Sequence, residues 1–173
     1  MKYYKEINGE VVFFTGKVLN YNGTSILNPT EEQMLEAGWL VYQAPEPTNA
    51  EKLVAAKAEK IAQIENYDAS DNVEQFTIND IPMWLGHEVR QQIRTSADAY
   101  SALGRTEMTK IFNGQEFTFT ITEWYQMLNL LEIYAAEALN TTERHKAAVQ
   151  ALSTINEVVD YDYTTGYPTK LEF

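Results

Sequence analysis

The stretch MTKIFNGQEFTFTITEWYQMLNLLEIYAAEAL, residues 108–139, contains a strand signal followed by a helix signal. Apolar and β-branched residues flank Asn113-Gly114, a dipeptide typical of a two-residue β-hairpin turn. The second half predicts a helix that begins after Thr122, as its N-cap, and ends near Leu139. Apolar residues occupy most of the helix surface, so we expect a central and mostly buried helix.

Further elements are predicted on both sides of this stretch. A strand over 73–78 precedes Pro82, which suits the first turn of a helix that ends near Gly104. After the central helix, the polar residues at 140–142 predict the cap of a separate last helix. An irregular tail rich in tyrosine follows at 161–168.

The N-terminal part of the chain has a different composition, with short β-rich runs, a hairpin turn at Asn8-Gly9 and a proline-containing linker near residue 45. The sequence therefore predicts an α+β protein in three parts. These are a small β-rich N-terminal module at 1–48, a linker helix at 49–65 and a C-terminal, mainly helical domain with a β-hairpin at 66–173.

The predicted linker helix has a thin apolar stripe that includes Leu53 and Ile61. The stripe spans about two heptads, fewer than the three or four that indicate a coiled coil. Two interpretations stay open: the helix packs on its own domain, or it contributes to self-association.

Composition and charge exclude several functions. Thirteen basic residues against 25 acidic residues give a net charge of -12, which repels a phosphate backbone, so no nucleic-acid partner is expected. The chain has no cysteine and therefore no disulfide or thiolate site.

The distribution of apolar residues indicates where the protein resides. Residues 1–6 lack the apolar run of a secretory signal, and the most apolar later stretch is interrupted by polar residues. We expect a cytoplasmic protein without membrane insertion.

The histidines and the Asp-rich tail do not match known catalytic or metal motifs. His87 lacks the second histidine four residues later that a zinc-protease helix needs, and His145 lies in a charged helix start. The run 160–166 alternates acids and hydroxyls as calcium loops do, but no acid stands at the twelfth position, Leu171, which favours a plain turn. We predict no catalytic residue, no cofactor and no metal site.

Acidic pairs are the remaining candidates for catalysis. A glycosidase needs only two carboxyl groups a few ångströms apart. Glu88 and Glu123 are arbitrary but testable choices among 25 acidic residues.

Three tyrosines in the tail, Tyr161, Tyr163 and Tyr167, are candidates for a protein interface together with Leu53 and Ile61. Tyrosine offers contact area and a hydroxyl at little entropic cost. The alternative is that the tail folds back over its own domain.

A collinear set of short motifs resembles a family of phage and prophage tail-region proteins, typical of gut bacteria, that contains a C-terminal domain of unknown function. The motifs are Tyr67-Asp68 with Ser70, Phe76-Thr77-Ile78-Asn79, Met83-Trp84-Leu85 followed by Arg90, Phe112-Asn113-Gly114-Gln115-Glu116-Phe117-Thr118-Phe119, Leu131-Glu132-Ile133-Tyr134-Ala135, Thr142 with His145-Lys146-Ala147-Ala148-Val149, Tyr161-Asp162-Tyr163-Thr164, and Gly166-Tyr167-Pro168 with Leu171.

The resemblance covers about residues 66–173, and residues 28–42 are similar to a short N-terminal module that often precedes this domain. At Gly86-His87 the chain departs from the family, which often has an acidic residue and a lysine there.

The resemblance implies a non-catalytic structural protein of the tail tip, baseplate or fibre region. Such a protein would bind other phage tail proteins or itself, as an oligomer where fibres are formed. It would reside in the bacterial cytoplasm during assembly and in the virion if it is structural. A tail-fibre assembly chaperone and a cell-wall glycosidase are the alternatives.

Overall fold

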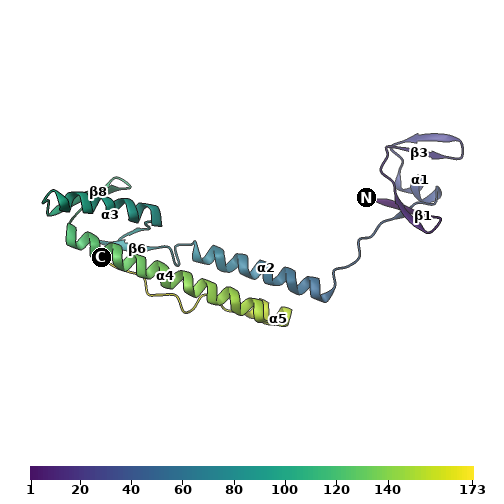
Figure 1. Ribbon diagram of the computed structural model, residues 1–173. Coiled ribbons are helices and arrows are strands. Elements are labelled where there is room, and N and C mark those ends of the chain that lie inside the picture. Colours follow the sequence, from purple (N-terminus) through teal and green to yellow (C-terminus); the bar gives the residue numbers. More distant parts are fainter. The chain divides into compact units, whose positions relative to one another are not determined.

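The computed structural model describes residues 1–173, the whole chain, as two compact units, Met1–Pro47 and Thr48–Phe173. Helices and antiparallel sheets are both present, which confirms the predicted α+β class (Figure 1). The helix predicted at 49–65 extends over Asn49–Asp68 and is counted with the second unit, where it packs on two other helices.

The first unit contains five short strands and one short helix: β1 (Tyr3–Ile7), β2 (Glu10–Phe13), β3 (Val18–Tyr21), β4 (Thr24–Leu27), α1 (Glu31–Glu36) and β5 (Leu40–Val41). The second unit contains four helices and two hairpins: α2 (Asn49–Asp68), β6 (Phe76–Ile78), β7 (Ile81–Met83), α3 (His87–Ala102), β8 (Glu107–Phe112), β9 (Gln115–Thr120), α4 (Ile121–Ala151) and α5 (Ile155–Asp160).

All four β-hairpins have two-residue turns in which both residues have positive φ. This is the type I′ geometry, which matches the twist of the paired strands and favours Asn, Asp and Gly. The turns lie at Asn8-Gly9, Asn22-Gly23, Asn79-Asp80 and Asn113-Gly114. The first and the last of them are where the sequence predicts them.

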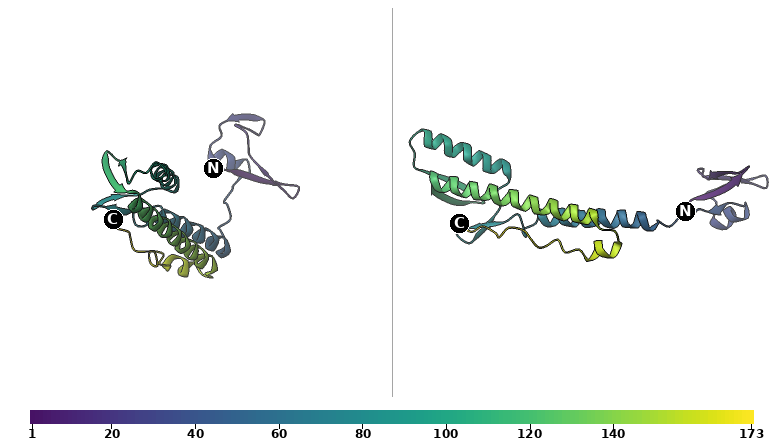
Figure 2. Two further views of the ribbon diagram at one scale, coloured as in Figure 1. Left: turned by 60° about the vertical axis from the view of Figure 1, so that its left-hand side comes forward. Right: turned by 60° about the horizontal axis from the view of Figure 1, so that its bottom comes forward.

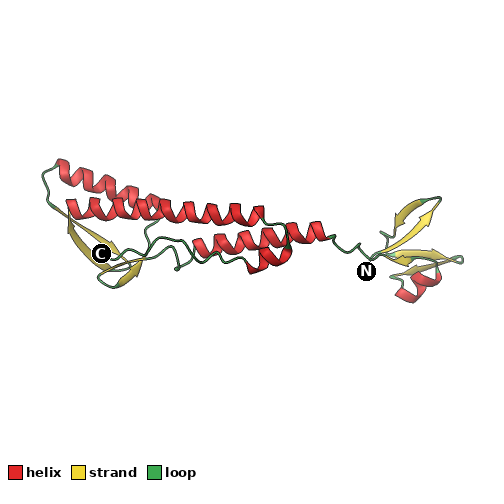
Figure 3. Ribbon diagram, turned by 90° about the horizontal axis from the view of Figure 1, so that it is seen from below, coloured by secondary structure: helices red, strands yellow, loops and turns green.

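The first unit is built on the antiparallel sheet β2-β1-β5. Helix α1 lies on one side of this sheet (Figure 3). The core on that side has three buried side chains, Leu19, Met34 and Ala37, with partly buried aromatic side chains around them. This core is small for a unit of 47 residues.

The second unit is organised around α4, which packs against α2 and α3 along its length (Figure 2). Trp124 of α4 is fully buried, and its indole N–H donates to the Met108 carbonyl of β8 at 2.8 Å. A second cluster near the other end of α4 contains Ile64, Val149 and Val158. Helix α4 is central, as predicted, but it is not mostly buried. Only one side of it packs into the core, and Leu130, Ile133 and Leu139 are exposed.

The prediction that Pro82 opens a helix is wrong, because Pro82 lies in β7, paired with Thr77 of β6. Ile78 and Ile81 flank the two-residue turn and form a hydrogen-bonded pair, so Thr77 and Pro82 form the next, non-hydrogen-bonded pair. The ring nitrogen of Pro82 therefore faces away from β6, and no ladder hydrogen bond is lost. Helix α3 begins only at His87.

Helix α4 is a single helix of 31 residues where the sequence predicts two. Thr141 and Thr142 are buried within it and do not cap a new helix. The Thr141 hydroxyl lies 3.0 Å from the Glu137 carbonyl and 3.2 Å from the Gly166 carbonyl. Since the hydroxyls find partners in the helix and the tail, the backbone continues as helix through these residues.

The N-cap of α4 is Thr120 and not Thr122. The Thr120 hydroxyl accepts a hydrogen bond from the Glu123 backbone N–H at 3.2 Å, and the Glu123 carboxylate accepts one from the Thr120 N–H at 2.8 Å. This reciprocal arrangement is a capping box. Helices α1, α2 and α5 also begin with a capping box, so the motif Thr-x-x-Glu/Gln starts four of the five helices.

The residues after α5 return along the second unit to β6. Backbone hydrogen bonds join Thr77 to Leu171 and Phe173, and Thr77 forms a parallel bridge with Glu172. The ring of Phe173 packs edge-on against Phe76 of the core. No helix of the chain has the length and apolar character that crossing a bilayer requires.

Candidate functional site

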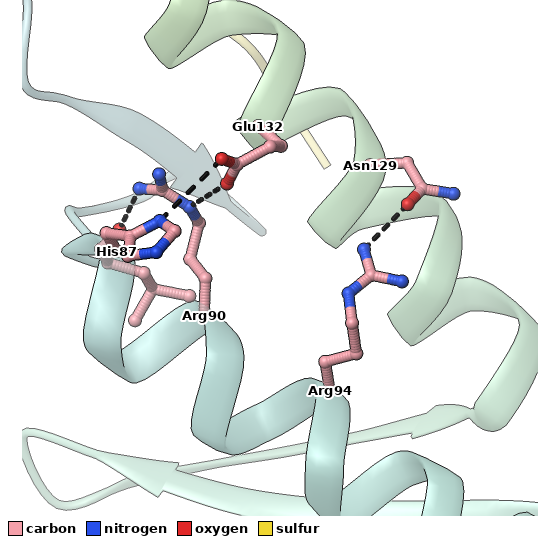
Figure 4. A network of polar contacts seen from close by, with 6 residues as sticks. His87, Arg90, Arg94, Asn129 and Glu132 are labelled. Atoms are coloured by element: carbon pink, nitrogen blue, oxygen red, sulfur yellow. Dashed lines mark hydrogen bonds and ion pairs between the residues drawn. The ribbon is translucent and has the colours of Figure 1, made fainter.

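A network of polar side chains joins α3 to α4 (Figure 4). Arg90 of α3 is buried, and its Nε donates to Glu132 Oε2 of α4 at 3.0 Å. A terminal guanidinium nitrogen of Arg90 donates to the Leu85 carbonyl at 2.7 Å. The Nδ1 atom of His87 lies 3.6 Å from Oε1 of Glu132.

The same two helices share a second polar contact further along α3. Arg94 donates to Asn129 Oδ1 at 2.7 Å, and its guanidinium group stacks over the ring of Tyr125. The Tyr125 hydroxyl donates to Asp98 Oδ1 at 2.6 Å. Each cation in this network is paired with a group of the chain itself, so the network positions α3 on α4.

The two acids considered for glycoside hydrolysis lie at the starts of two helices. Glu88 is exposed in the first turn of α3. Hydrogen bonds from the Thr120 backbone N–H and hydroxyl hold the pKa of Glu123 below its ordinary value. A general acid of a glycosidase needs a raised pKa. Glu123 is therefore suited to capping α4 and not to donating a proton.

The C-terminal tail contacts α2 and α4 through its aromatic residues. Nδ1 of His145 lies 2.8 Å from the Tyr161 hydroxyl, and Nε2 lies 2.9 Å from the Thr165 carbonyl. The Tyr167 ring stacks on His145, and its hydroxyl lies 2.9 Å from the Thr142 hydroxyl. His145 thus holds the tail with both ring nitrogens.

The remaining residues predicted for an interface lie in the same region and are partly buried. Leu53 and Ile61 of α2 pack on the cluster around Val149. The ring of Tyr163 meets Tyr67 edge-on and lies under the ammonium group of Lys60. The structure therefore brings four of the five predicted residues into one cluster, with Tyr167 beside it on His145. A large part of their surface is used for contacts within the chain.

The acidic run at 160–166 forms an Asx turn. Oδ1 of Asp162 accepts hydrogen bonds from the Thr164 N–H at 2.9 Å and from the Thr164 hydroxyl at 2.7 Å. These bonds lower the pKa of Asp162. No group of three or more histidines and acids in the chain is placed to hold a metal ion.

A surface that the sequence analysis missed lies on the first unit, on the face of the β2-β1-β5 sheet that points away from the core. The rings of Tyr4, Phe13 and Tyr42 form a cluster there, with centroids 5.2 to 6.5 Å apart. Leu40 pairs with Tyr4, and Val11 lies further along β2 on the same face. These five residues are called the outer face below.

Most of the outer face is open to solvent. Phe13 is 42% exposed, Leu40 52% and Val11 57%. Beside the rings, Lys2, Phe13 and Tyr42 line a hollow of about 370 Å³. The outer face is thus an apolar surface that the first unit does not cover.

A sequence signal for the outer face exists in the paired aromatic residues Tyr3-Tyr4 and Phe13-Phe14. Successive residues of a strand point to opposite faces. Two adjacent rings in one strand therefore place one ring on each face, and in this unit only the side of Tyr3 and Phe14 contributes to the core.

Comparisons with protein families, curated proteins and solved structures found no match to this chain.

Proposed function

We propose that this chain is a non-catalytic structural protein of the tail tip, baseplate or fibre region of a phage or prophage. It would work through contacts with other tail proteins or with itself. The observation that carries the proposal is the uneven distribution of exposed apolar residues. Ten of the 19 large hydrophobic residues that are exposed lie in the first unit. Contiguous exposed apolar surface is typical of protein contacts.

The contacts of the polar residues and the pKa of Glu123 also support a non-catalytic role. The best candidates for chemistry, Arg90, Glu132, His145 and Glu123, are engaged in contacts that hold helices and tail together. Catalytic acids and bases need a pKa shifted toward their task, and the pKa of Glu123 is shifted in the opposite direction.

The choice of a phage tail region comes from the sequence resemblance described above. The same resemblance supports the proposed location, which is the bacterial cytoplasm during assembly and the virion afterwards. A nucleic-acid partner does not fit a net charge of -12.

Mass spectrometry of purified particles tests the proposal. Particles are induced from a lysogen that carries this gene, and the copy number is estimated against the major capsid protein. A fixed, small copy number per particle is expected. Absence from particles despite abundance in the lysate would overturn the structural role.

Two further measurements separate the alternatives if the protein is absent from particles. Capture of a tail fibre by the tagged full-length protein would indicate an assembly chaperone. Clearing of peptidoglycan that is lost on Glu123→Gln, with the helical circular dichroism retained, would indicate a glycosidase and would refute the non-catalytic proposal.

A further inference from the structure

We propose that the outer face binds the outer face of a second copy of this chain, so that two first units form a two-fold symmetric β-sandwich. This inference does not depend on a role in a phage tail. It concerns a surface other than the Tyr161, Tyr163 and Tyr167 region and the apolar stripe of α2.

The first unit has little else to stabilise it. Its core contains only three buried side chains in 47 residues. Units of this size usually need disulfides, metals or oligomerisation in addition to a core. The chain has no cysteine, and no cluster of metal ligands is present. Covering the outer face would add Tyr4, Phe13, Leu40 and Tyr42 to a shared core.

The charges on this face are self-complementary. Lys2, Tyr4 and Glu6 alternate along the start of the chain and so share the outer side of the sheet. Lys2 lines the hollow beside Phe13 and Tyr42, and Glu6 pairs with Val11. If two copies stack with their β1 strands antiparallel and their Tyr4 residues opposite each other, Lys2 of each copy faces Glu6 of the other.

The charge of the chain does not oppose a contact through the outer face. The chain carries a net charge of -12, and the first unit carries -3, with three lysines against six acidic residues. The outer face with Lys2 and Glu6 has no net charge, so two copies meet little repulsion there. An isologous contact of this kind also closes after two copies and does not propagate into a fibre.

Sheet packing permits this orientation. Two stacked sheets keep their strands within about 30° of each other, and antiparallel stacking satisfies that rule. The contact involves only short strands, so we expect a weak dimer, as is typical of interfaces smaller than about 1,200 Å² in total.

Sedimentation velocity of the full-length chain at several concentrations tests the proposal. A reversible monomer–dimer equilibrium is expected, and Phe13→Ser should weaken it by at least about tenfold. Leu27→Ser is the matched control, since Leu27 is 68% exposed in the same unit but lies in the β3–β4 hairpin. The control should dimerise as the wild type does.

Charge reversal separates loss of the contact from loss of the fold. Lys2→Glu should weaken the dimer, because it places two acidic residues opposite each other, and Lys2→Glu combined with Glu6→Lys should restore it. A monomeric wild type at about 100 µM, well above a micromolar dissociation constant, would overturn the proposal and direct attention to a different partner protein. A dimer that none of these variants weakens would also overturn it, because another surface would then be responsible.

Discussion

Arg90 is the only charged side chain buried in the chain, and it serves two partners at once. Replacing it with alanine would remove the ion pair with Glu132 and leave the Leu85 carbonyl without its donor. Because Glu132 is half exposed, we expect Arg90→Ala to lower the free energy of unfolding by about 2 to 4 kcal/mol, toward the lower part of the range for buried pairs.

Arg94→Ala is the matched control for Arg90→Ala, because Arg94 lies one turn further along α3 and bonds a neutral, exposed partner. Its loss should lower the free energy of unfolding by less than about 1 kcal/mol. Equal effects of the two variants in denaturant titrations would show that burial of Arg90 is unimportant.

Trp124 combines complete burial with a hydrogen bond to the Met108 carbonyl. Trp124→Ala should lower the free energy of unfolding by about 3 to 5 kcal/mol, because it opens a cavity between α4 and the β8–β9 hairpin. Trp84→Ala should have a smaller effect, since Trp84 is only partly buried. A loss below about 1 kcal/mol at Trp124 in the same titration would contradict its central place in the core.

The fold raises the pKa of Glu74, first through burial and then through the nearby charge of Asp68. The folded state therefore holds the Glu74 proton more tightly than the unfolded state. Stability should fall as the pH rises from the ordinary value of 4.5 through the raised pKa, and stay constant above it.

Glu74→Gln should remove this penalty. The variant should be more stable than the wild type at neutral pH and lose that advantage below the ordinary pKa. Thermal melts from pH 4 to 8 measure the difference, with Glu116→Gln on the exposed side of β9 as a control that should change little. A gain that is independent of pH would contradict this explanation.

At the scale of elements, the start of α4 offers a direct comparison of two neighbouring threonines. Thr120 forms the capping box with Glu123, whereas the Thr122 side chain is exposed in the first turn. Thr120→Ala should destabilise the second unit by about 1 kcal/mol. Thr122→Ala should change it by less than about 0.5 kcal/mol. Urea titrations followed by helical circular dichroism distinguish the two, and the reverse order would restore Thr122 as the cap.

A local sequence signal predicts an element well where only one backbone geometry is compatible with that signal. Asn-Gly turns require positive φ at both positions, so Asn113-Gly114 identifies its hairpin without tertiary information. Pro82 is ambiguous, because a proline suits both a first helical turn and an edge strand, and only the pairing with Thr77 distinguishes them.

The continuity of α4 depends on contacts that lie far apart in the sequence. Thr142 suggests a cap when only its neighbours are considered. In the structure its hydroxyl donates to Asp68 of α2 and contacts the Tyr167 hydroxyl of the tail. Because these partners satisfy the hydroxyl, Thr142 does not cap a new helix and α4 continues through it. The outer face was missed for a related reason: alternation shows that a strand has two apolar faces, but not which face the rest of the unit covers.

At the scale of the whole molecule, the two units differ in what stabilises them. The second unit has two buried clusters, including Trp124 and Val149, whereas the first unit has a single small one. Dimerisation through the outer face would stabilise only the folded first unit, because binding to a native state shifts its unfolding equilibrium by mass action.

We therefore expect two unfolding transitions in the full-length chain. Hydrogen exchange followed by mass spectrometry across a temperature series should show strands β1 and β2 losing protection first, at a temperature that rises with protein concentration. Helix α4 should lose protection later, at a temperature that does not depend on concentration, because its core lies within one chain.

In the Phe13→Ser variant the temperature of the first transition should become independent of concentration, while the temperature of the second transition should not change. A single transition for both units would show that the chain unfolds cooperatively as one domain, and two transitions that both ignore concentration would show that the first unit is stable as a monomer.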